Sequence, residues 1–195
     1  MLVLLQELMA DDLRRVRAPS GARLFRQGDA ARGLFLLKVG KVRLLRHTSD
    51  GNEVILHTAR PGESLAEASL FAEHYHCEAV ALEDSVAMLA PKERLHALLR
   101  THPQAAELLF ARLARQVREL RTQLELRNIR RAEERLLAAL RLRADANGAV
   151  TIGDTWKDLA AELGLTQEAL YRALSRLERQ GAIIRPATRT VLLRS

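Results

Sequence analysis

The stretch that decides the fold is DTWKDLAAELGLTQEALYRALSRLERQG, residues 154–181, because it predicts two helices joined by a tight turn. Thr155 and Thr166 are good N-caps, since their hydroxyl oxygens can accept hydrogen bonds from the free N–H groups of a first helical turn. Asp158, three residues after Thr155, completes the spacing of a capping box. Gly164 lies between the two helices and supplies the sharp stop that ends the first one.

The second helix, predicted at about residues 166–178, has one apolar and one polar face. Leu170, Leu174 and Leu177 fall at i, i+4 and i+7 and form a single stripe to bury. The other face presents the candidate DNA contacts Thr166, Gln167, Glu168, Tyr171, Arg172 and Ser175. This arrangement is typical of a helix-turn-helix motif. The alternative is an ordinary helical hairpin, in which Glu168 and Arg172 form an i,i+4 ion pair on a solvated face.

The positive charge of the chain lies in its C-terminal part. Residues 111–195 hold 17 basic and 10 acidic residues, which accounts for the whole net charge of +7, and 16 of those cations are Arg. Residues 1–110 hold 14 of each sign. Phosphate neutralisation supplies most non-specific DNA affinity, and Arg suits bidentate recognition of phosphate and guanine. The charge distribution therefore favours double-stranded DNA as a partner.

The cysteine content and the N-terminus exclude several classes of protein. The single cysteine, Cys77, excludes an intrachain disulfide and an iron–sulfur cluster held by several thiolates. In the first residues, MLVLLQELMADDLRR, charged side chains follow too short an apolar run for a signal peptide. No apolar run in the sequence is long enough to span a membrane. We therefore expect a cytoplasmic protein with no membrane partner.

Residues from Ser20 to about 90 are predicted to form short strands of an antiparallel sandwich or small barrel, and residues 91–100 have helical spacing. Glycines recur between short apolar runs, and Asp50-Gly51 is a strong hairpin turn. Cys77–Leu89 is expected to be a further strand, broken in the middle. Before these strands, Leu4–Met9 have helical spacing, and Asp11–Val16 are expected to add a turn or two to that helix.

A long helix is predicted for residues 101–131, with Thr101 as its cap and Pro103 in its first turn. Its apolar residues recur at spacings of three and four and form a coiled-coil seam of Phe110, Leu113, Val117, Leu120 and Leu124. A reader of paired DNA half-sites needs two-fold symmetry, so we expect a homodimer through this seam. The alternative is a helix that packs only on its own β-domain.

The remaining residues complete a winged helix-turn-helix, so that the fold class is α+β. Residues 132–142 have helical spacing, and Val150 and Ile152 suggest a strand. After Gly181, residues 182–185 and 190–193 are expected to form a hairpin with Arg189 at its tip, where it can touch DNA phosphate.

The order of these parts resembles the CRP/FNR family of bacterial transcription regulators over essentially the whole chain. The matching residues are Leu24-Phe25, Gly28-Asp29, Gly40-Lys41-Val42, Pro61-Gly62-Glu63, Glu67, Leu70-Phe71, Leu159-Ala160, Leu163-Gly164, Glu168, Arg172, Leu174 and Leu177-Glu178. The resemblance implies a cyclic-nucleotide-binding-like sensor domain at 1–100, folded as an antiparallel β-roll of the double-stranded jelly-roll type. It also implies a dimerisation helix at 101–131 and a winged helix-turn-helix DNA-binding domain at 132–195.

The resemblance also implies a function. A chain of this kind is a dimeric regulator rather than an enzyme, it reads palindromic half-sites, and it acts with RNA polymerase, by analogy as an activator. The family's Glu-x-x-x-Arg pair on the recognition helix corresponds to Glu168 and Arg172, which suits a G·C pair read by Arg at guanine and Glu at the cytosine amino group. Gln167 stands where the cyclic-AMP-responsive members have an arginine.

The candidate effector pocket consists of Glu67, Cys77 and Glu78. In cyclic-nucleotide-binding relatives a glutamate bonds the ribose, and an arginine followed by a hydroxyl residue binds the phosphate. Here the glutamate is Glu67, but Cys77 stands in place of the arginine and Glu78 in place of the hydroxyl. Because a phosphate needs a cation and donors, and a carboxylate repels it, we expect that cyclic AMP is not the effector.

Three further interpretations of the sensor region stay open from the sequence. His74, His76 and Cys77 have the donor types of a haem, soft-metal or redox-sensing site, although exposed histidines and a buried cysteine fit equally well. A second possibility is a regulator with no effector, controlled by its own abundance. The third is a cupin-like metalloenzyme using the His-x-His run, for which the required glycine is missing and His96 lies in a helical stretch.

Overall fold

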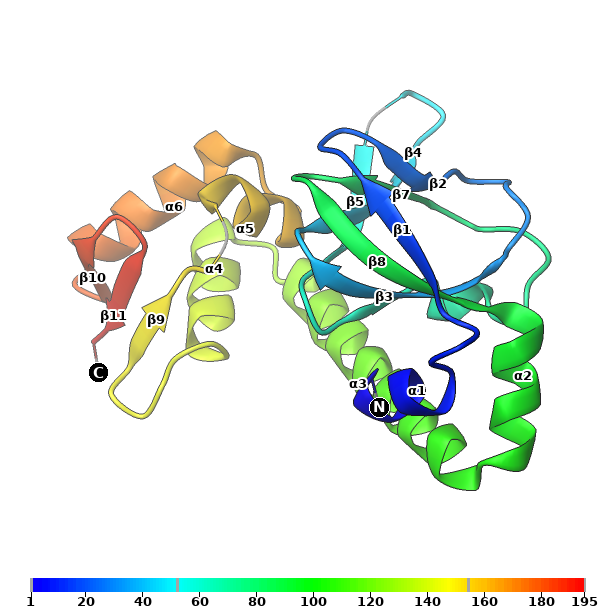
Figure 1. Ribbon diagram of the computed structural model, residues 1–195. Coiled ribbons are helices and arrows are strands. Elements are labelled where there is room, and N and C mark those ends of the chain that lie inside the picture. The colour runs from blue at the N-terminus through cyan, green and yellow to red at the C-terminus, as the bar shows by residue number, and fades with distance from the viewer. Residues whose placement is uncertain (1, 52, 154, 195) are drawn as a thin grey trace. The chain divides into compact units, whose positions relative to one another are not determined.

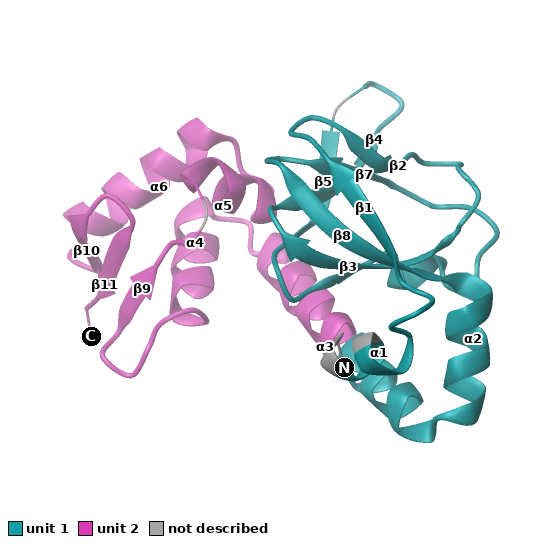
Figure 2. Cartoon of the chain, viewed as in Figure 1, with its two compact units in different colours: residues 1–114 teal, residues 115–195 magenta. Residues whose placement is uncertain are grey.

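The computed structural model describes residues 2–51, 53–153 and 155–194. The chain forms two compact units, residues 1–114 and 115–195 (Figures 1 and 2). The long helix α3, Pro103–Asn128, begins in the first unit and ends in the second. Among the described residues, no helix is long and apolar enough to cross a membrane.

The first unit contains the short antiparallel strands that the glycine spacing predicts, arranged as the β-roll that the resemblance implies. Its elements are α1 (Leu2–Leu8), β1 (Arg14–Ala18), β2 (Arg23–Phe25), β3 (Gly33–Val39), β4 (Val42–His47), β5 (Glu53–Ala59), β6 (Ser64–Leu65), a 3-10 turn (Glu67–Ser69), β7 (Glu78–Ala81), β8 (Ser85–Pro91), α2 (Lys92–Thr101) and the start of α3. The strands form two four-stranded antiparallel sheets, in the orders β1-β8-β3-β6 and β2-β7-β4-β5.

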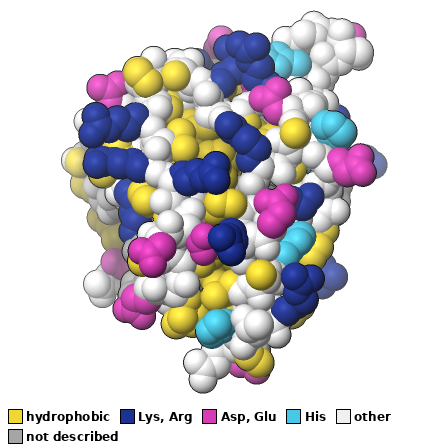
Figure 3. Space-filling view, turned by 45° about the vertical axis from the view of Figure 1, so that its right-hand side comes forward, with side chains coloured by type: hydrophobic (Ala, Val, Ile, Leu, Met, Phe, Trp, Pro, Cys, Tyr) yellow, Lys and Arg dark blue, Asp and Glu magenta, His cyan; other side chains and the backbone are white. Residues whose placement is uncertain are grey.

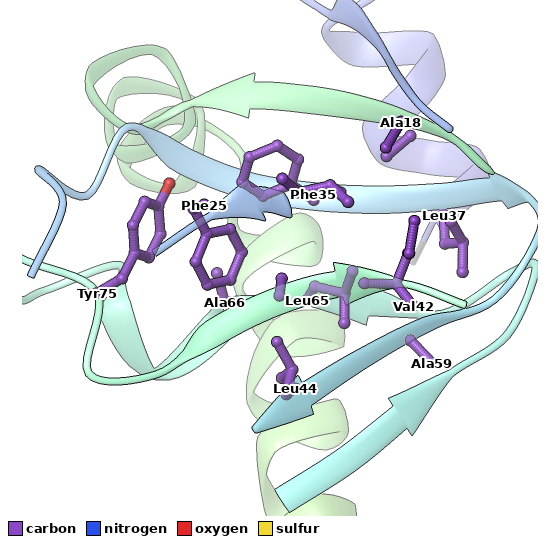
Figure 4. Close-up of a cluster of buried hydrophobic side chains, with 14 of the residues drawn as sticks. Ala18, Phe25, Phe35, Leu37, Val42, Leu44, Ala59, Leu65, Ala66 and Tyr75 are labelled. Atoms are coloured by element: carbon purple, nitrogen blue, oxygen red, sulfur yellow. The ribbon is translucent and has the colours of Figure 1, made fainter. Parts of the chain in front are cut away.

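A hydrophobic core fills the space between these two sheets. It takes residues from both, for example Phe35 and Leu37 of β3 from one sheet and Val42 and Leu44 of β4 from the other. At one end of the core the rings of Phe25 and Tyr75 stack, with centroids 4.0 Å apart (Figure 4). The interior is therefore packed with side chains of the chain itself.

Strand β3 is buried on both faces. Residues Gly33–Leu37 are all buried, and Leu34 and Leu36 join a second core that contains residues of α1, α2 and α3. This explains the continuous apolar run LFLL, since a strand covered on both sides does not alternate between apolar and polar residues. The helices thereby cover the outer face of the sheet that contains β1, β8 and β3.

Two expectations about local structure are wrong. Asp11–Val16 do not extend the first helix, because residues from Arg14 form β1, which pairs with β8 and buries Ala18 in the inter-sheet core. Long-range pairing thus overrides the local pattern. Thr101 does not cap α3 either: it is the last residue of α2, and its hydroxyl donates to the carbonyls of Ala97 and Leu98.

The second unit has the elements of a winged helix-turn-helix. They are the end of α3, α4 (Ala132–Arg141), β9 (Ala149–Thr151), α5 (Trp156–Glu162), α6 (Gln167–Arg179), β10 (Ile183–Ala187) and β11 (Thr190–Leu193). The three strands form a small antiparallel sheet in the order β10-β11-β9. One core joins leucines of α3, α4, α5 and α6 to Val150, Ile183 and Val191 of the sheet. The expected α+β architecture is confirmed.

Candidate nucleic-acid interface and sensor site

The two helices of the helix-turn-helix begin and end as the residue types predict. Oγ1 of Thr155 accepts a hydrogen bond from the N–H of Asp158 at 3.2 Å, and the Asp158 carboxylate accepts from the N–H of Thr155 at 3.3 Å, which completes the capping box of α5. Oγ1 of Thr166 accepts from the N–H of Ala169 at 3.1 Å and caps α6. Gly164 in the turn has φ 63°, a left-handed conformation that favours glycine.

Helix α6 buries its leucine stripe and exposes the predicted face. Leu170, Leu174 and Leu177 are buried in the core of the second unit. The candidate contacts Thr166, Gln167, Glu168, Tyr171, Arg172 and Ser175 are all exposed. Among the described residues, neither Glu168 nor Arg172 has an ion pair or a side-chain hydrogen bond, so the expected alternative of an i,i+4 pair is not formed. Both charged groups are available to a ligand.

Other arginines of this unit are already engaged. Arg176 of α6 forms an ion pair with Glu133 of α4. The guanidinium of Arg185, on β10, binds the carboxylate of Glu178 with distances of 2.8 and 2.5 Å, and this hydrogen bonding lowers the pKa of Glu178 below its usual value. These pairs join α6 to α4 and to the wing, whereas Arg172 of the same helix has no such partner in the described part of the chain.

The wing is held in place by a residue that the sequence interpretation missed. Nε1 of Trp156, the first residue of α5, donates to the carbonyl of Thr188 at 2.9 Å, and the N–H of Ile152 donates to the carbonyl of Arg189 at 2.8 Å. The Arg189 side chain is exposed in the turn between β10 and β11. A lone tryptophan at a helix start was the only available signal, because its partner lies 32 residues away in the chain.

The predicted seam of α3 is largely exposed in the single chain. Phe110, Val117, Leu120 and Leu124 are between 47 and 70% exposed. Leu113 differs, because it is half-buried against the core that contains α1 and α2. The stripe begins beside Phe71, which is 78% exposed and shares with Phe110 an apolar groove of about 330 Å³ in the first unit. Unpaired apolar surface of this kind marks an interaction site.

Glu67 is buried in the first unit and is bound by the chain's own side chains. The Ser64 hydroxyl donates to Oε1 of Glu67 at 2.5 Å. Nε of Arg112, on α3, lies 2.9 Å from Oγ of Ser64 and 3.4 Å from Oε1 of Glu67. The sequence interpretation did not include Arg112, because its position beside residues 64–67 depends on how α3 packs against the β-roll.

Cys77 and Glu78 lie next to each other in the chain but in different surroundings. The Cys77 side chain is buried in the inter-sheet core, and this burial raises the pKa of its thiol to about 11. Glu78 is almost buried, and its carboxylate forms an ion pair with Nε of Arg23 at 2.9 Å, while Nδ1 of His47 lies 3.7 Å away. Neither a buried thiol nor a carboxylate already paired with Arg23 supplies the cation that a phosphate needs.

The histidines near Cys77 do not converge on it. His74 and His76 are exposed, whereas the Cys77 side chain points into the core, and Nδ1 of His76 lies 3.4 Å from Oγ of Ser69. His96 lies on α2 and stacks on Phe71 with ring centroids 4.9 Å apart. In the described part of the chain, no three His, Cys, Asp or Glu side chains are grouped so that they could hold a metal ion.

The surface is mixed in charge. On the face shown in Figure 3, basic and acidic side chains are interspersed with apolar ones. Arg172 and Arg189, two of the arginines in residues 111–195, are exposed.

Comparisons with known proteins agree with this architecture. Residues 15–102 match the family of the cyclic nucleotide-binding domain. The chain is 35% identical over 170 residues to the cyclic AMP receptor protein of Thermus thermophilus, which covers 85% of this chain and 77% of that protein. It is 28% identical over 170 residues to the transcriptional activator protein Anr of Pseudomonas aeruginosa, covering 84% and 70%. The structure of FixK2 from Bradyrhizobium japonicum shares the fold, with a TM-score of 0.71 and 24% identity over 94% of this chain and 93% of that one.

Proposed function

The chain belongs to the CRP/FNR family of transcription regulators, and from this premise we propose that it acts as a homodimer that binds a two-fold symmetric site in double-stranded DNA. In this proposal each α6 enters the major groove of one half-site. Anr of Pseudomonas aeruginosa is named as a transcriptional activator, and this supports a regulator of transcription rather than an enzyme.

The observation that carries the proposal is that Glu168 and Arg172 are exposed on α6 and form no ion pair with any residue that the structure describes. Arg172 can donate two hydrogen bonds to O6 and N7 of guanine, and Glu168 can accept one from the cytosine amino group. Thr166, Gln167, Tyr171 and Ser175 lie on the same face, and Arg189 of the wing is proposed to contact phosphate.

For the dimer, we propose that the exposed stripe of α3 pairs with the same stripe of a second copy. Phe110, Val117, Leu120 and Leu124 would form the seam, with Leu113 shared between the seam and the core of its own unit. Sedimentation should give a dimer for the natural protein and a monomer for Leu120→Glu, because a charge in the seam is buried without a partner. A monomeric natural protein at micromolar concentration contradicts this proposal.

The decisive experiment is selection of bound DNA from a random pool by the purified protein. We expect a palindromic site with two G·C-containing half-sites whose centres are one helical turn or a multiple of it apart, as for other dimeric helix-turn-helix proteins. Selection of no sequence, or of a single half-site by a monomer, contradicts the proposal. On a promoter with the selected site, transcription by RNA polymerase in vitro then tests the expected role as an activator.

We also propose that cyclic AMP is not the effector. The support is chemical: at the position of the phosphate-binding arginine, Cys77 is buried in the core, and Glu78 next to it carries a negative charge paired with Arg23. Calorimetry is expected to detect no binding of cyclic AMP. Micromolar affinity for cyclic AMP, with a matching rise in DNA affinity, contradicts the proposal.

Among the remaining alternatives, the geometry favours a regulator without a haem, metal or redox effector. Cys77 points away from the exposed His74 and His76, and its high pKa keeps the thiol protonated at neutral pH. Control by abundance then predicts a DNA affinity that is unchanged by metals, haem, oxidants and reductants. A visible haem spectrum, or stoichiometric metal in the purified protein, contradicts this choice.

A further inference from the structure

The turn of the helix-turn-helix is held by arginines from outside the motif. Helix α5 ends at Glu162, and the backbone N–H groups of Gly164 and Leu165 in the turn donate to the carbonyls of Ala161 and Ala160. The next two carbonyls, of Glu162 and Leu163, are bound by arginine side chains. Nε of Arg127, in the last turn of α3, donates to the Glu162 carbonyl at 3.2 Å, and Nη1 of Arg135, on α4, donates to the Leu163 carbonyl at 2.8 Å. Cations at a helix C-terminus also suit the helix dipole.

Arg135 binds a second element with the rest of its guanidinium. Its Nε and Nη2 donate to the carbonyl of Ile129 at 2.9 and 2.7 Å. Ile129 lies in the segment 129–131 that joins α3 to α4. The planar guanidinium of Arg135, a rigid fork of N–H donors, therefore connects this segment, which we call the joint, to the turn between α5 and α6. Lysine offers only a single point charge and cannot reproduce the contact.

Apolar contacts also hold the joint against the core that contains the leucines of α6. Leu126, in the last turn of α3, is buried in that unit's core, and Ile129 packs against it. The N-cap of α4, Arg131, makes no side-chain capping hydrogen bond, so α4 itself does not stabilise the joint in this way. Arg127 and Arg135 thus add side-chain hydrogen bonds between the end of α3, the joint and the turn to these apolar contacts and to the local backbone bonds of the turn.

We propose that Arg135, assisted by Arg127, is a positioning residue that determines which half-site spacing the dimer accepts. This inference rests on the proposed DNA-binding dimer. If α3 forms the seam, the contacts at the joint transmit the orientation of α3 to α6, and the two recognition helices are held at one separation. Inserting one base pair between half-sites moves one of them by about 3.4 Å and about 35°. A stiff joint cannot follow that movement, whereas a loosened joint can.

The experiment measures affinity for three DNA sites: the selected site and versions with one base pair added to, or removed from, the centre. Arg135→Met keeps the length of the side chain but removes its donors. Arg141→Met is the matched control, because Arg141 also lies on α4, is exposed, and loses the same charge. Arg135→Lys retains the charge without the fork.

For the natural protein and Arg141→Met, we expect the altered spacing to weaken binding by about 30-fold or more, since the DNA has to deform to fit. For Arg135→Met, the selected site should bind about tenfold more weakly and the penalty for altered spacing should shrink to about threefold, with Arg135→Lys between the two. A purely structural role would weaken all three sites equally. Sedimentation and thermal unfolding show whether each variant is folded and dimeric. If Arg135→Met folds poorly, Arg127→Met tests the same joint with a milder change.

The outcomes separate this inference from the function it rests on. If the natural protein and Arg135→Met show the same penalty for altered spacing, the inference is wrong while the DNA-binding dimer stands. If the natural protein selects no palindromic site, the proposed function is wrong, and the inference is wrong with it. Relaxed spacing in Arg141→Met as well would show that charge, not the fork, is responsible, and would also overturn the inference.

Discussion

Two combinations of a glutamate and an arginine in this chain differ, because one forms a buried contact and the other stays exposed, with its two members unpaired with each other. In the first unit Glu67 is buried and is contacted by Arg112 and by the Ser64 hydroxyl. In the second unit Glu168 and Arg172 are exposed at i,i+4 spacing on α6 and do not bind each other. The same two residue types thus form an internal network at one site and an available binding face at the other.

The difference follows from burial. A carboxylate removed from water is costly unless donors satisfy it, so Glu67 keeps Ser64 and Arg112 close. On a solvated helix face an ion pair is worth little, because water competes for both groups. Glu168 and Arg172 are therefore free to exchange water for bases. The proposed DNA recognition therefore rests on polar groups exposed at the surface rather than on those in the core.

The largest expected effect comes from removing the exposed cation. Arg172→Ala should cost about 2–6 kcal/mol of discrimination across two half-sites, because each bidentate arginine–guanine pair contributes about 1–3 kcal/mol. Weak, salt-sensitive binding should remain, and the stability of the protein should hardly change. Competition gel shifts with selected and scrambled DNA measure this. Arg179→Ala, on the same helix, is the control and should weaken binding to the selected and the scrambled DNA alike. If Arg172→Ala keeps the preference for the selected DNA, Arg172 does not read a base.

The next effect concerns Cys77, whose thiol is buried in the inter-sheet core. Because burial raises its pKa to about 11, the thiolate fraction at pH 8 should be about 100-fold below that of an unperturbed thiol, and Cys77 should react correspondingly slowly. Thiol titration with an aromatic disulfide before and after unfolding measures this. Rapid reaction in the folded protein would reopen the redox-sensing alternative.

The buried pair is tested by Arg112→Met, which leaves Glu67 with Ser64 alone. We expect the β-roll unit to lose about 2–3 kcal/mol of stability, less than for a fully buried pair because Arg112 is partly exposed. Circular dichroism should record the loss, whereas the fluorescence of Trp156, the only tryptophan, should report unchanged unfolding of the second unit. Arg118→Met, an exposed change on the same helix, should have little effect; equal losses in both variants would contradict the role given to Arg112.

The smallest expected effect is the pH dependence of the Glu178–Arg185 pair. Its hydrogen bond lowers the pKa of Glu178 in the folded protein from the usual value of 4.5, so the pair stabilises the protein above that pH and the contribution is lost as the pH falls through the lowered pKa. For a partly exposed pair we expect at most about 1 kcal/mol. Unfolding followed by Trp156 fluorescence, in the natural protein and Glu178→Gln, should differ at pH 7 and converge in acid. A difference that grows in acid would contradict the sign.

Much of the fold was predictable because its signals are local. A capping residue, a left-handed glycine or a leucine stripe acts within a few residues, so the sequence by itself determined α5, the turn at Gly164 and the two faces of α6. The hairpin between β4 and β5 and the wing between β10 and β11 were likewise predictable from turn residues flanked by β-branched and aliphatic runs.

The remaining features depend on contacts between residues far apart in the chain, and only the tertiary structure decided them. Arg14–Ala18 become a strand because β8 offers a partner more than 60 residues later. Arg112 reaches Ser64, Trp156 reaches Thr188, and Arg135 joins Ile129 to Leu163. No periodicity in the sequence predicts such pairs, because the long-range partner of a side chain depends on packing and on the need to satisfy buried polar groups.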